Sequence, residues 1–264
     1  MADPTLRYDL TDHIATITLN RPEAMNALTR ELYGELEAAV RRSHSDAEVR
    51  CVIITGEGRA FCSGDDVKQI MLGEQRDATT ARLRDVRPRP TPAAAAILEC
   101  DKPVIAAVNG PAVGWGMDLT LFADIRIASE RAKFGELFIK RGLVADLGGL
   151  WRLPSVVGPS KAAELLFTGD VISAEEALKI GLVSTVVPHE ELLPTARAMA
   201  AKIAANPPIA MRYMKEGLRR ARHAGMEDMG AYIGSSLAYL FTTADHREGA
   251  LSFVERREPV FTGR

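Results

Sequence analysis

Two glycine-bearing loops are the parts of this 264-residue sequence whose residue types and spacing favour catalysis. The loop "GEGRAFCSGDDVKQI" follows the apolar run "CVIIT", and the loop "NGPAVGWGMDLTLF" follows the run "VIAAV". Each pattern predicts a strand followed by a helix, and the first N–H groups of a helix have no acceptor within it. Two such turns could direct one N–H each at the same oxygen atom. That arrangement is an oxyanion hole, which stabilises negative charge as it develops on the oxygen.

The glycine spacing of the second loop also allows a nucleotide-binding interpretation. Gly110, Gly114 and Gly116 after a strand match the turn of short-chain nicotinamide reductases. Such enzymes would resemble a fold with this turn near the N-terminus and a Tyr-x-x-x-Lys pair, yet no tyrosine here has a lysine four residues later. A dinucleotide site also expects an acid at the end of the next strand, where only Glu130 is available. The reductase remains an alternative that lacks two of its expected features.

Two aspartates near these loops are candidates for acid–base chemistry. Asp118 lies one helical turn after Trp115, so its side chain could point into the same site. Asp146 stands in "GLVADLGGLW" beside apolar residues, where partial burial suits a carboxylate to act as a base. Structural interpretations are a buried carboxylate bonded to loop N–H groups for Asp118 and a helix cap for Asp146. Asp65 and Asp66 fit caps better than catalysts, so only the backbone N–H of Asp65 is assigned to chemistry.

The elements that must position these residues alternate along the chain. The apolar spacing from Leu28 to Val40 predicts an amphipathic helix, and residues 82–96 favour an irregular loop that leads into another helix. Strand, glycine-rich loop and helix recur, which predicts an α/β architecture. The first two strand candidates are predicted to form a hairpin. The strand candidates are "LRYDL", "HIATITLN", "CVIIT", "VIAAV", "DIRIAS" and "LVSTVV".

The C-terminal part of the chain is predicted to be mostly helical. Ser160 and Ser173 are expected as N-caps, and Gly181 is expected just beyond a helix end. Pro207 and Pro208 predict a break between two helices, because proline disfavours helix continuation.

The composition excludes several classes of partner. The 33 basic and 35 acidic residues give a formal net charge of -2, so no overall field favours nucleic acid or an anionic membrane. The three cysteines lack a paired spacing and the five histidines lack ligand spacing, so neither a metal site nor a disulfide framework is predicted. No stretch has the length of a membrane span or the pattern of a signal peptide. A cytoplasmic protein is therefore expected.

Six segments that cover nearly the whole chain resemble the crotonase superfamily of acyl-CoA enzymes, also called the enoyl-CoA hydratase/isomerase family. They are "NRPEAMNAL" at 20–28, "GRAFCSGDDVKQI" at 58–70, "KPVIAAVNGPAVGWGMDL" at 102–119, "DIRIASERAKFGE" at 124–136, "GLVADLGGLWRLPSVVG" at 142–158 and "DHREGALSFVERREPVFTGR" at 245–264.

The resemblance implies a fold, an assembly and a substrate. It implies a crotonase-like spiral of repeated ββα turns over residues 1–195, which binds acyl-CoA, and a helical C-terminal trimerisation region over 196–264. The protein is expected to form homotrimers, or hexamers made of two trimers. The substrate would be an acyl-CoA thioester, so coenzyme A would be part of the substrate and no separate cofactor is expected.

The resemblance also assigns the oxyanion hole, in which the N–H groups of Asp65 and Trp115 hold the thioester carbonyl. The family usually has glycine at the second position, so Trp115 is a departure that would reshape the acyl pocket while keeping the N–H. Phe138 and Trp115 are expected as pocket walls, with core packing as the other interpretation. The full set of expected substrate contacts, including positions near coenzyme A, is Ser63, Gly64, Asp66, Val67, Lys68, Gly114, Phe138, Phe253 and Arg256.

The reaction depends on which carboxylates line the acyl group. Hydratases of the family carry two glutamates, which align with Asp118 and Phe138, and phenylalanine can neither donate nor accept a proton. Isomerases similar to 1,2-epoxyphenylacetyl-CoA isomerase pair a phenylalanine at this place with an aspartate that matches Asp146. The preferred hypothesis is that Asp146 moves a proton between two carbons of an enoyl-CoA and so shifts the double bond, while Asp118 assists.

Three alternatives within or beside the family stay open. A 2-enoyl-CoA hydratase could divide the acid and base roles between Asp118 and Asp146. The 4-chlorobenzoyl-CoA dehalogenase branch also has an aspartate aligned with Asp146, but no histidine lies between His44 and His189 to serve as its base. A non-catalytic paralogue that binds acyl-CoA would explain the absence of glutamate at Phe138, whereas the retained aspartates argue against it.

Overall fold

A six-stranded sheet with the order β1-β2-β3-β4-β6-β9 lies at the centre of the computed structural model, which describes residues 4–72 and 90–264. The first two strands form the predicted antiparallel hairpin, and every later neighbour is parallel. The strands are β1 (Leu6–Thr11), β2 (Ile14–Leu19), β3 (Cys51–Gly56), β4 (Val104–Val108), β6 (Ile125–Ser129) and β9 (Thr185–Val187). Strands β2, β3 and β4 are almost entirely buried, as expected for apolar runs covered on both faces.

A small second sheet has the order β5-β7-β8, formed by β5 (Pro111–Val113), β7 (Lys133–Gly135) and β8 (Ile172–Ser173). Because β5 follows β4 after two residues and helix α4 (Trp115–Phe122) follows β5 after one, the second glycine-bearing loop passes from one sheet to the other. Short helical turns η2 (Val67–Met71), η4 (Leu137–Arg141) and η5 (Gly148–Arg152) surround this passage.

Helices α1 (Arg30–Ser45) and α3 (Pro92–Glu99) pack against each other beside the sheet. The Thr29 hydroxyl caps α1 by accepting from the N–H of Leu32 at 3.2 Å, and the predicted apolar face of this helix is buried. The sequence predicted an irregular loop over residues 82–96 that leads into a helix. Residues 82–89 lie outside the described residues, and the predicted helix is α3.

The predicted caps in the C-terminal half are partly correct. Ser173 caps α7 (Ala174–Lys179) by accepting from the N–H of Glu176 at 3.2 Å, and Gly181 follows this helix with φ +73°. Ser160 is not an N-cap, because α6 (Pro159–Thr168) begins one residue earlier and Gly158 is its cap. Proline fits the first position of a helix, and α6 follows α5 (Leu153–Val157) at this point.

Helix α8 (Leu192–Ala204) belongs to the core. Its residues Leu192, Ala196, Ala200 and Ala204 form one buried cluster with isoleucines and other apolar residues of the sheet. The expected boundary between residues 195 and 196 falls inside this helix, so the C-terminal region that leaves the core starts after α8.

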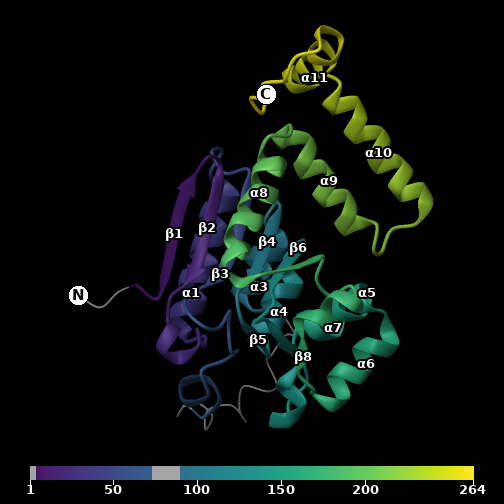
Figure 1. Ribbon diagram of the computed structural model, residues 1–264. Coiled ribbons are helices and arrows are strands. Elements are labelled where there is room, and N and C mark those ends of the chain that lie inside the picture. The colour runs from purple at the N-terminus through teal and green to yellow at the C-terminus, as the bar shows by residue number, and fades with distance from the viewer. Residues whose placement is uncertain (1–3, 73–89) are drawn as a thin grey trace.

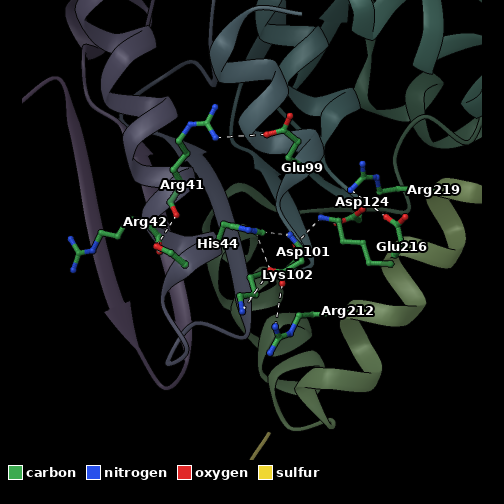
Figure 2. Close-up of polar contacts among 12 residues, drawn as sticks. Arg41, Arg42, His44, Glu99, Asp101, Lys102, Asp124, Arg212, Glu216 and Arg219 are labelled. Atoms are coloured by element: carbon green, nitrogen blue, oxygen red, sulfur yellow. Dashed lines mark hydrogen bonds and ion pairs between the residues drawn. The ribbon is translucent and has the colours of Figure 1, made fainter. Parts of the chain in front are cut away.

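Helices α9 (Pro208–Arg220), α10 (Met226–Leu240) and α11 (Ala244–Glu255) form an arm that extends away from the sheet (Figure 1). The predicted break at the two prolines separates α8 from α9. Figure 2 shows Asp101, before β4, between His44 of α1 and Arg212 of α9. On the same helix, Lys215 Nζ lies 2.8 Å from Asp124 Oδ2 and donates to the Lys102 carbonyl at 2.7 Å. These contacts fix the base of the arm to the core.

Within residues 4–72 and 90–264, no helix combines the length and the apolar character that crossing a membrane requires.

Candidate active site

The two glycine-bearing loops cross in direct contact. The N–H of Val113 donates to the Cys62 carbonyl at 3.0 Å, and Cys62 and Ala112 form an isolated parallel bridge. A Cβ atom on Gly116 would lie 2.1 Å from the Cys62 carbonyl oxygen, and one on Gly64 would lie 2.9 Å from the Val113 carbonyl oxygen. Both positions therefore require glycine, because a side chain would force the loops apart.

The backbone N–H groups of Asp65 and Trp115 emerge where these loops meet. Trp115 is the first residue of α4, after Gly114 at φ +55°, and a Cβ on Gly64 would lie 3.4 Å from the Trp115 nitrogen. Among the residues that the structure describes, neither N–H donates a hydrogen bond. Both residues line one cavity of about 60 Å³. The site therefore holds two neighbouring N–H groups without acceptors, as the sequence predicted for this pair of turns.

The cavity wall includes most of the expected substrate contacts from the two loops. From the loops these are Ser63, Gly64, Val67 and Gly114, which lie beside the oxyanion-hole residues Asp65 and Trp115. The half-buried Phe138 adds a further expected contact from η4. Neither Asp118 nor Asp146 is among the residues that line this cavity.

The Trp115 side chain is only 2% exposed and points into the core. Its ring packs edge-on against Tyr33 at 4.8 Å and against Phe122 at 5.8 Å between ring centres. The indole Nε1–H donates to Asp146 Oδ2 at 3.2 Å. Trp115 thus contributes its N–H to the cavity wall and its indole to the core, where it contacts the proposed base.

Asp146 is half-buried and has two hydrogen-bond donors. In addition to the indole, the N–H of Leu147 donates to Asp146 Oδ1 at 2.7 Å. Leu147 stands between Asp146 and η5 and is the N-cap of η5, which has no side-chain cap hydrogen bond, so the helix-cap interpretation of Asp146 is wrong. The two oxygens of Asp146 are held instead by the Trp115 indole and by the N–H of the next residue.

Asp118 lies one turn into α4 and is completely buried, beside an equally buried carboxyl group, Glu136. Gly148 and Gly149 close over the pair, because a Cβ on Gly148 would lie 2.2 Å from Asp118 Oδ1 and one on Gly149 would lie 3.1 Å from Glu136 Oε2. Among the described residues, no donor reaches any of the four carboxyl oxygens. A proton shared by the two groups would satisfy them.

The pKa values of this pair are raised. Burial, followed by the neighbouring Glu136 and Asp146 carboxylates, raises the pKa of Asp118 well above its usual range. Burial and the Asp146 carboxylate raise the pKa of Glu136 to about 8. Two like charges in one buried space cannot both ionise readily, so one proton remains on the pair near neutral pH.

The other expected contacts lie apart from the cavity. Asp66 accepts from the N–H of Gln69 at 3.2 Å, which makes it the cap of η2, and it also faces Arg21 at 3.4 Å. Lys68 is exposed on η2. Phe253 on α11 and Arg256 directly after it belong to the arm, and Figure 1 shows α11 at the top of the molecule, well separated from β5 below its centre.

Sequence reasoning did not assign Glu136 or Tyr33 to the site. The Tyr33 hydroxyl donates to Asp65 Oδ1 at 2.6 Å, and burial raises the pKa of Asp65, while the Tyr33 hydroxyl lowers it. Glu136 ends a motif used for the family resemblance, and its place at the end of that motif was the available signal. The α1 periodicity placed Tyr33 beside the buried face of the helix without indicating a polar partner.

A family model for enoyl-CoA hydratase/isomerase matches residues 9–264, and the chain belongs to this family of enzymes. It is 39% identical over 268 residues to a probable enoyl-CoA hydratase of Rhodobacter capsulatus, with 100% of both chains covered. It is 38% identical over 256 residues to the (E)-benzylidenesuccinyl-CoA hydratase of Thauera aromatica, covering 97% of this chain and 98% of the relative.

Solved structures agree with the sequence comparisons. The crystal structure of enoyl-CoA hydratase from Mycobacterium tuberculosis H37Rv superimposes with a TM-score of 0.90 at 37% identity, covering 99% of this chain and 100% of that chain. The predicted family and the predicted α/β crotonase-like fold are both confirmed.

Proposed function

We propose that this protein stabilises the enolate of an acyl-CoA thioester and shifts the double bond of an enoyl-CoA by proton transfer through Asp146. The observation that carries the proposal is the pair of N–H groups, Asp65 and Trp115, which have no acceptor among the described residues and line one cavity. Named relatives that are enoyl-CoA hydratases support an acyl-CoA thioester as the substrate class.

The two N–H groups would act on the thioester oxygen. Removal of a proton next to the thioester, or two carbons farther along an enoyl chain, places negative charge on this oxygen. Donors already aimed at the oxygen stabilise the charged state more than the neutral carbonyl, which lowers the barrier. Removing one such donor typically costs about 2.7 to 4 kcal/mol of transition-state stabilisation.

Asp146 would carry the proton. Its carboxylate takes a proton from one carbon, the electron pair of the broken C–H bond enters the dienolate, and the same proton returns to the other carbon while the double bond moves. One base is enough for this exchange, and no water is consumed. Asp118, completely buried beside Glu136, is better placed to assist than to bind a water molecule.

Hydration of a 2-enoyl-CoA through Asp118 and Asp146 is the second candidate. Relatives named crotonyl-CoA hydratase in Syntrophomonas wolfei and short-chain-enoyl-CoA hydratase in Clostridium acetobutylicum favour it. The two reactions differ in product, because hydration removes the conjugated double bond and adds water, whereas isomerisation moves the bond without adding atoms.

The remaining expected contacts are proposed to complete the site in an assembly. We infer that Lys68, Phe253 and Arg256 contact coenzyme A, with the residues on α11 reaching a neighbouring subunit. Exposed apolar side chains on the C-terminal arm support a homotrimer, alone or stacked as a hexamer: Ile233, Leu237, Phe241, Phe253 and Val254. Mass determination by light scattering tests this assembly, and a monomer would contradict it.

The function is tested by incubating the purified protein with 2-enoyl-CoA and 3-enoyl-CoA substrates. Loss of conjugation with a mass gain of one water identifies hydration, and interconversion at constant mass identifies isomerisation. Asp146→Asn should lower kcat on the order of a hundredfold or more, since general-base catalysis supplies about 10² to 10⁴. The exposed Asp170→Asn is the matched control. Full activity of Asp146→Asn would refute the role of Asp146, and absence of turnover in the wild type would favour a binding protein.

A further inference from the structure

The two residues that supply the cavity N–H groups are also connected through their side chains. Asp65 Oδ1 accepts from the Tyr33 hydroxyl at 2.6 Å, and the Tyr33 ring lies edge-on to the Trp115 ring with 4.8 Å between centres. Trp115 Nε1–H donates to Asp146 Oδ2 at 3.2 Å. One continuous series of contacts therefore joins both oxyanion loops to the proposed base.

None of these groups can turn freely. The Trp115 ring is enclosed by Tyr33 on one side and Phe122 on another, and an indole has a single N–H, so its direction is fixed by the ring. The other oxygen of Asp146 is held by the N–H of Leu147. Tyr33 lies on α1 next to the buried Leu32, so the residue that connects the loops is carried by a helix.

We propose that Tyr33 and the indole of Trp115 are positioning residues, which keep the two oxyanion-hole N–H groups and the Asp146 carboxylate in one geometry. This inference rests on the proposed function. It gives the buried indole of Trp115 a positioning role in place of the pocket wall expected from the sequence. Small displacements of a reacting group reduce the rate of a reaction strongly. Contacts that hold the base and the two N–H donors in place should therefore increase the rate of proton transfer.

Two near-isosteric variants separate positioning from packing. Trp115→Phe keeps an aromatic ring and removes the N–H, and Tyr33→Phe removes only the hydroxyl. The matched controls are Trp151→Phe, the other tryptophan of the chain, and Tyr239→Phe, an exposed tyrosine of the C-terminal arm. Each protein is assayed for double-bond turnover and for exchange of the α-protons of a saturated acyl-CoA in D₂O, followed by NMR.

The exchange assay reports enolate formation without the complete reaction. For Trp115→Phe we expect kcat and the exchange rate to fall on the order of tenfold to a hundredfold, the usual effect of a lost hydrogen bond to a charged group, with KM changed less than about twofold. Tyr33→Phe should lower the same two rates by about tenfold. Both controls should keep the wild-type rates.

A double-mutant cycle tests whether the Trp115 indole acts through Asp146. Because it compares the same substitution in two backgrounds, it remains informative if a single variant also lowers folding stability. If Trp115 acts through Asp146, Trp115→Phe should have little further effect in an Asp146→Asn background. Two results would overturn the inference: additive losses of kcat in the double variant, or wild-type rates in both Trp115→Phe and Tyr33→Phe. Either result would show that the aromatic contacts only pack, and it would leave the proposed function intact. A wild-type protein that catalyses neither exchange nor turnover would overturn both.

Discussion

Replacing Glu136 with glutamine should reduce the pH dependence of folding stability. Glu136 is 1% exposed and lies beside the fully buried Asp118, and no donor of the described residues reaches either carboxyl group. Glutamine has nearly the same shape and cannot ionise. The variant therefore leaves Asp118 with a neutral neighbour that can donate a hydrogen bond to it.

The direction and size follow from the raised pKa of Glu136. Burial is the main cause of a rise from 4.5 to about 8. The folded state then binds the proton more tightly than the unfolded chain, so the free energy of unfolding falls as the pH rises through this interval and is level below and above it. At 1.36 kcal/mol per pKa unit, a rise of this kind corresponds to a loss on the order of a few kcal/mol, which Glu136 and Asp118 share.

Urea unfolding from about pH 5 to about pH 9 tests this expectation. The wild type should lose on the order of a few kcal/mol across the range, and Glu136→Gln should lose less, because only Asp118 of the pair still titrates. The stability of the variant relative to the wild type should therefore rise toward the alkaline end. Glu130→Gln, at an exposed position, should follow the wild type. Parallel curves for the wild type and Glu136→Gln would refute a buried, proton-sharing pair.

Three further outcomes follow from burial and contact. Gly116→Ala would place a Cβ 2.1 Å from the Cys62 carbonyl oxygen and should abolish activity and lower Tm strongly, whereas Gly234→Ala, with open space in α10, should keep both. Lys215→Ala should lower the free energy of unfolding by about 3 kcal/mol in chemical denaturation, because the buried ammonium group contacts a carboxylate and a carbonyl. As a control, Lys179→Ala removes a side chain that is 80% exposed and should cost under about 0.5 kcal/mol. All three cysteine thiols are buried, so a thiol reagent should modify none in the folded protein and all three after denaturation.

Local patterns predicted most of the fold, because most of its elements are decided by short stretches. The run "VIAAV" is buried on both faces as β4, and β1 and β2 pair as the predicted hairpin. The predictions were wrong where neighbouring elements decide. Ser160 has the right residue type for a cap, but Pro159 already begins the helix. The expected domain boundary stays a prediction; residues 195 and 196 lie within α8, whose packing on the sheet depends on isoleucines distant in sequence.

The site was predictable only where backbone chemistry defines it. The glycine pattern and strand–helix order indicated which two loops would carry free N–H groups, and the family resemblance gave the residues Asp65 and Trp115, which line one cavity. Side-chain partnerships were not predictable, because they join separate elements. Glu136 meets Asp118 from the turn after β7, and Tyr33 meets Asp65 from α1. No short-range spacing encodes either contact.

The tryptophan at position 115 is compatible with the loop because the backbone demands glycine only on either side of it. Gly114 has φ +55° and ψ −129°, a conformation that side chains disfavour, and Gly116 faces the Cys62 carbonyl too closely for a Cβ. Trp115 lies between them at the first helical position, outside the left-handed region, so it keeps its N–H at the cavity at no backbone cost. A bulky side chain is therefore permitted at this one place, and it extends to the carboxylate of Asp146. An aspartate at position 146 and an indole at position 115 should consequently depend on each other, which is the dependence that the double-mutant cycle measures.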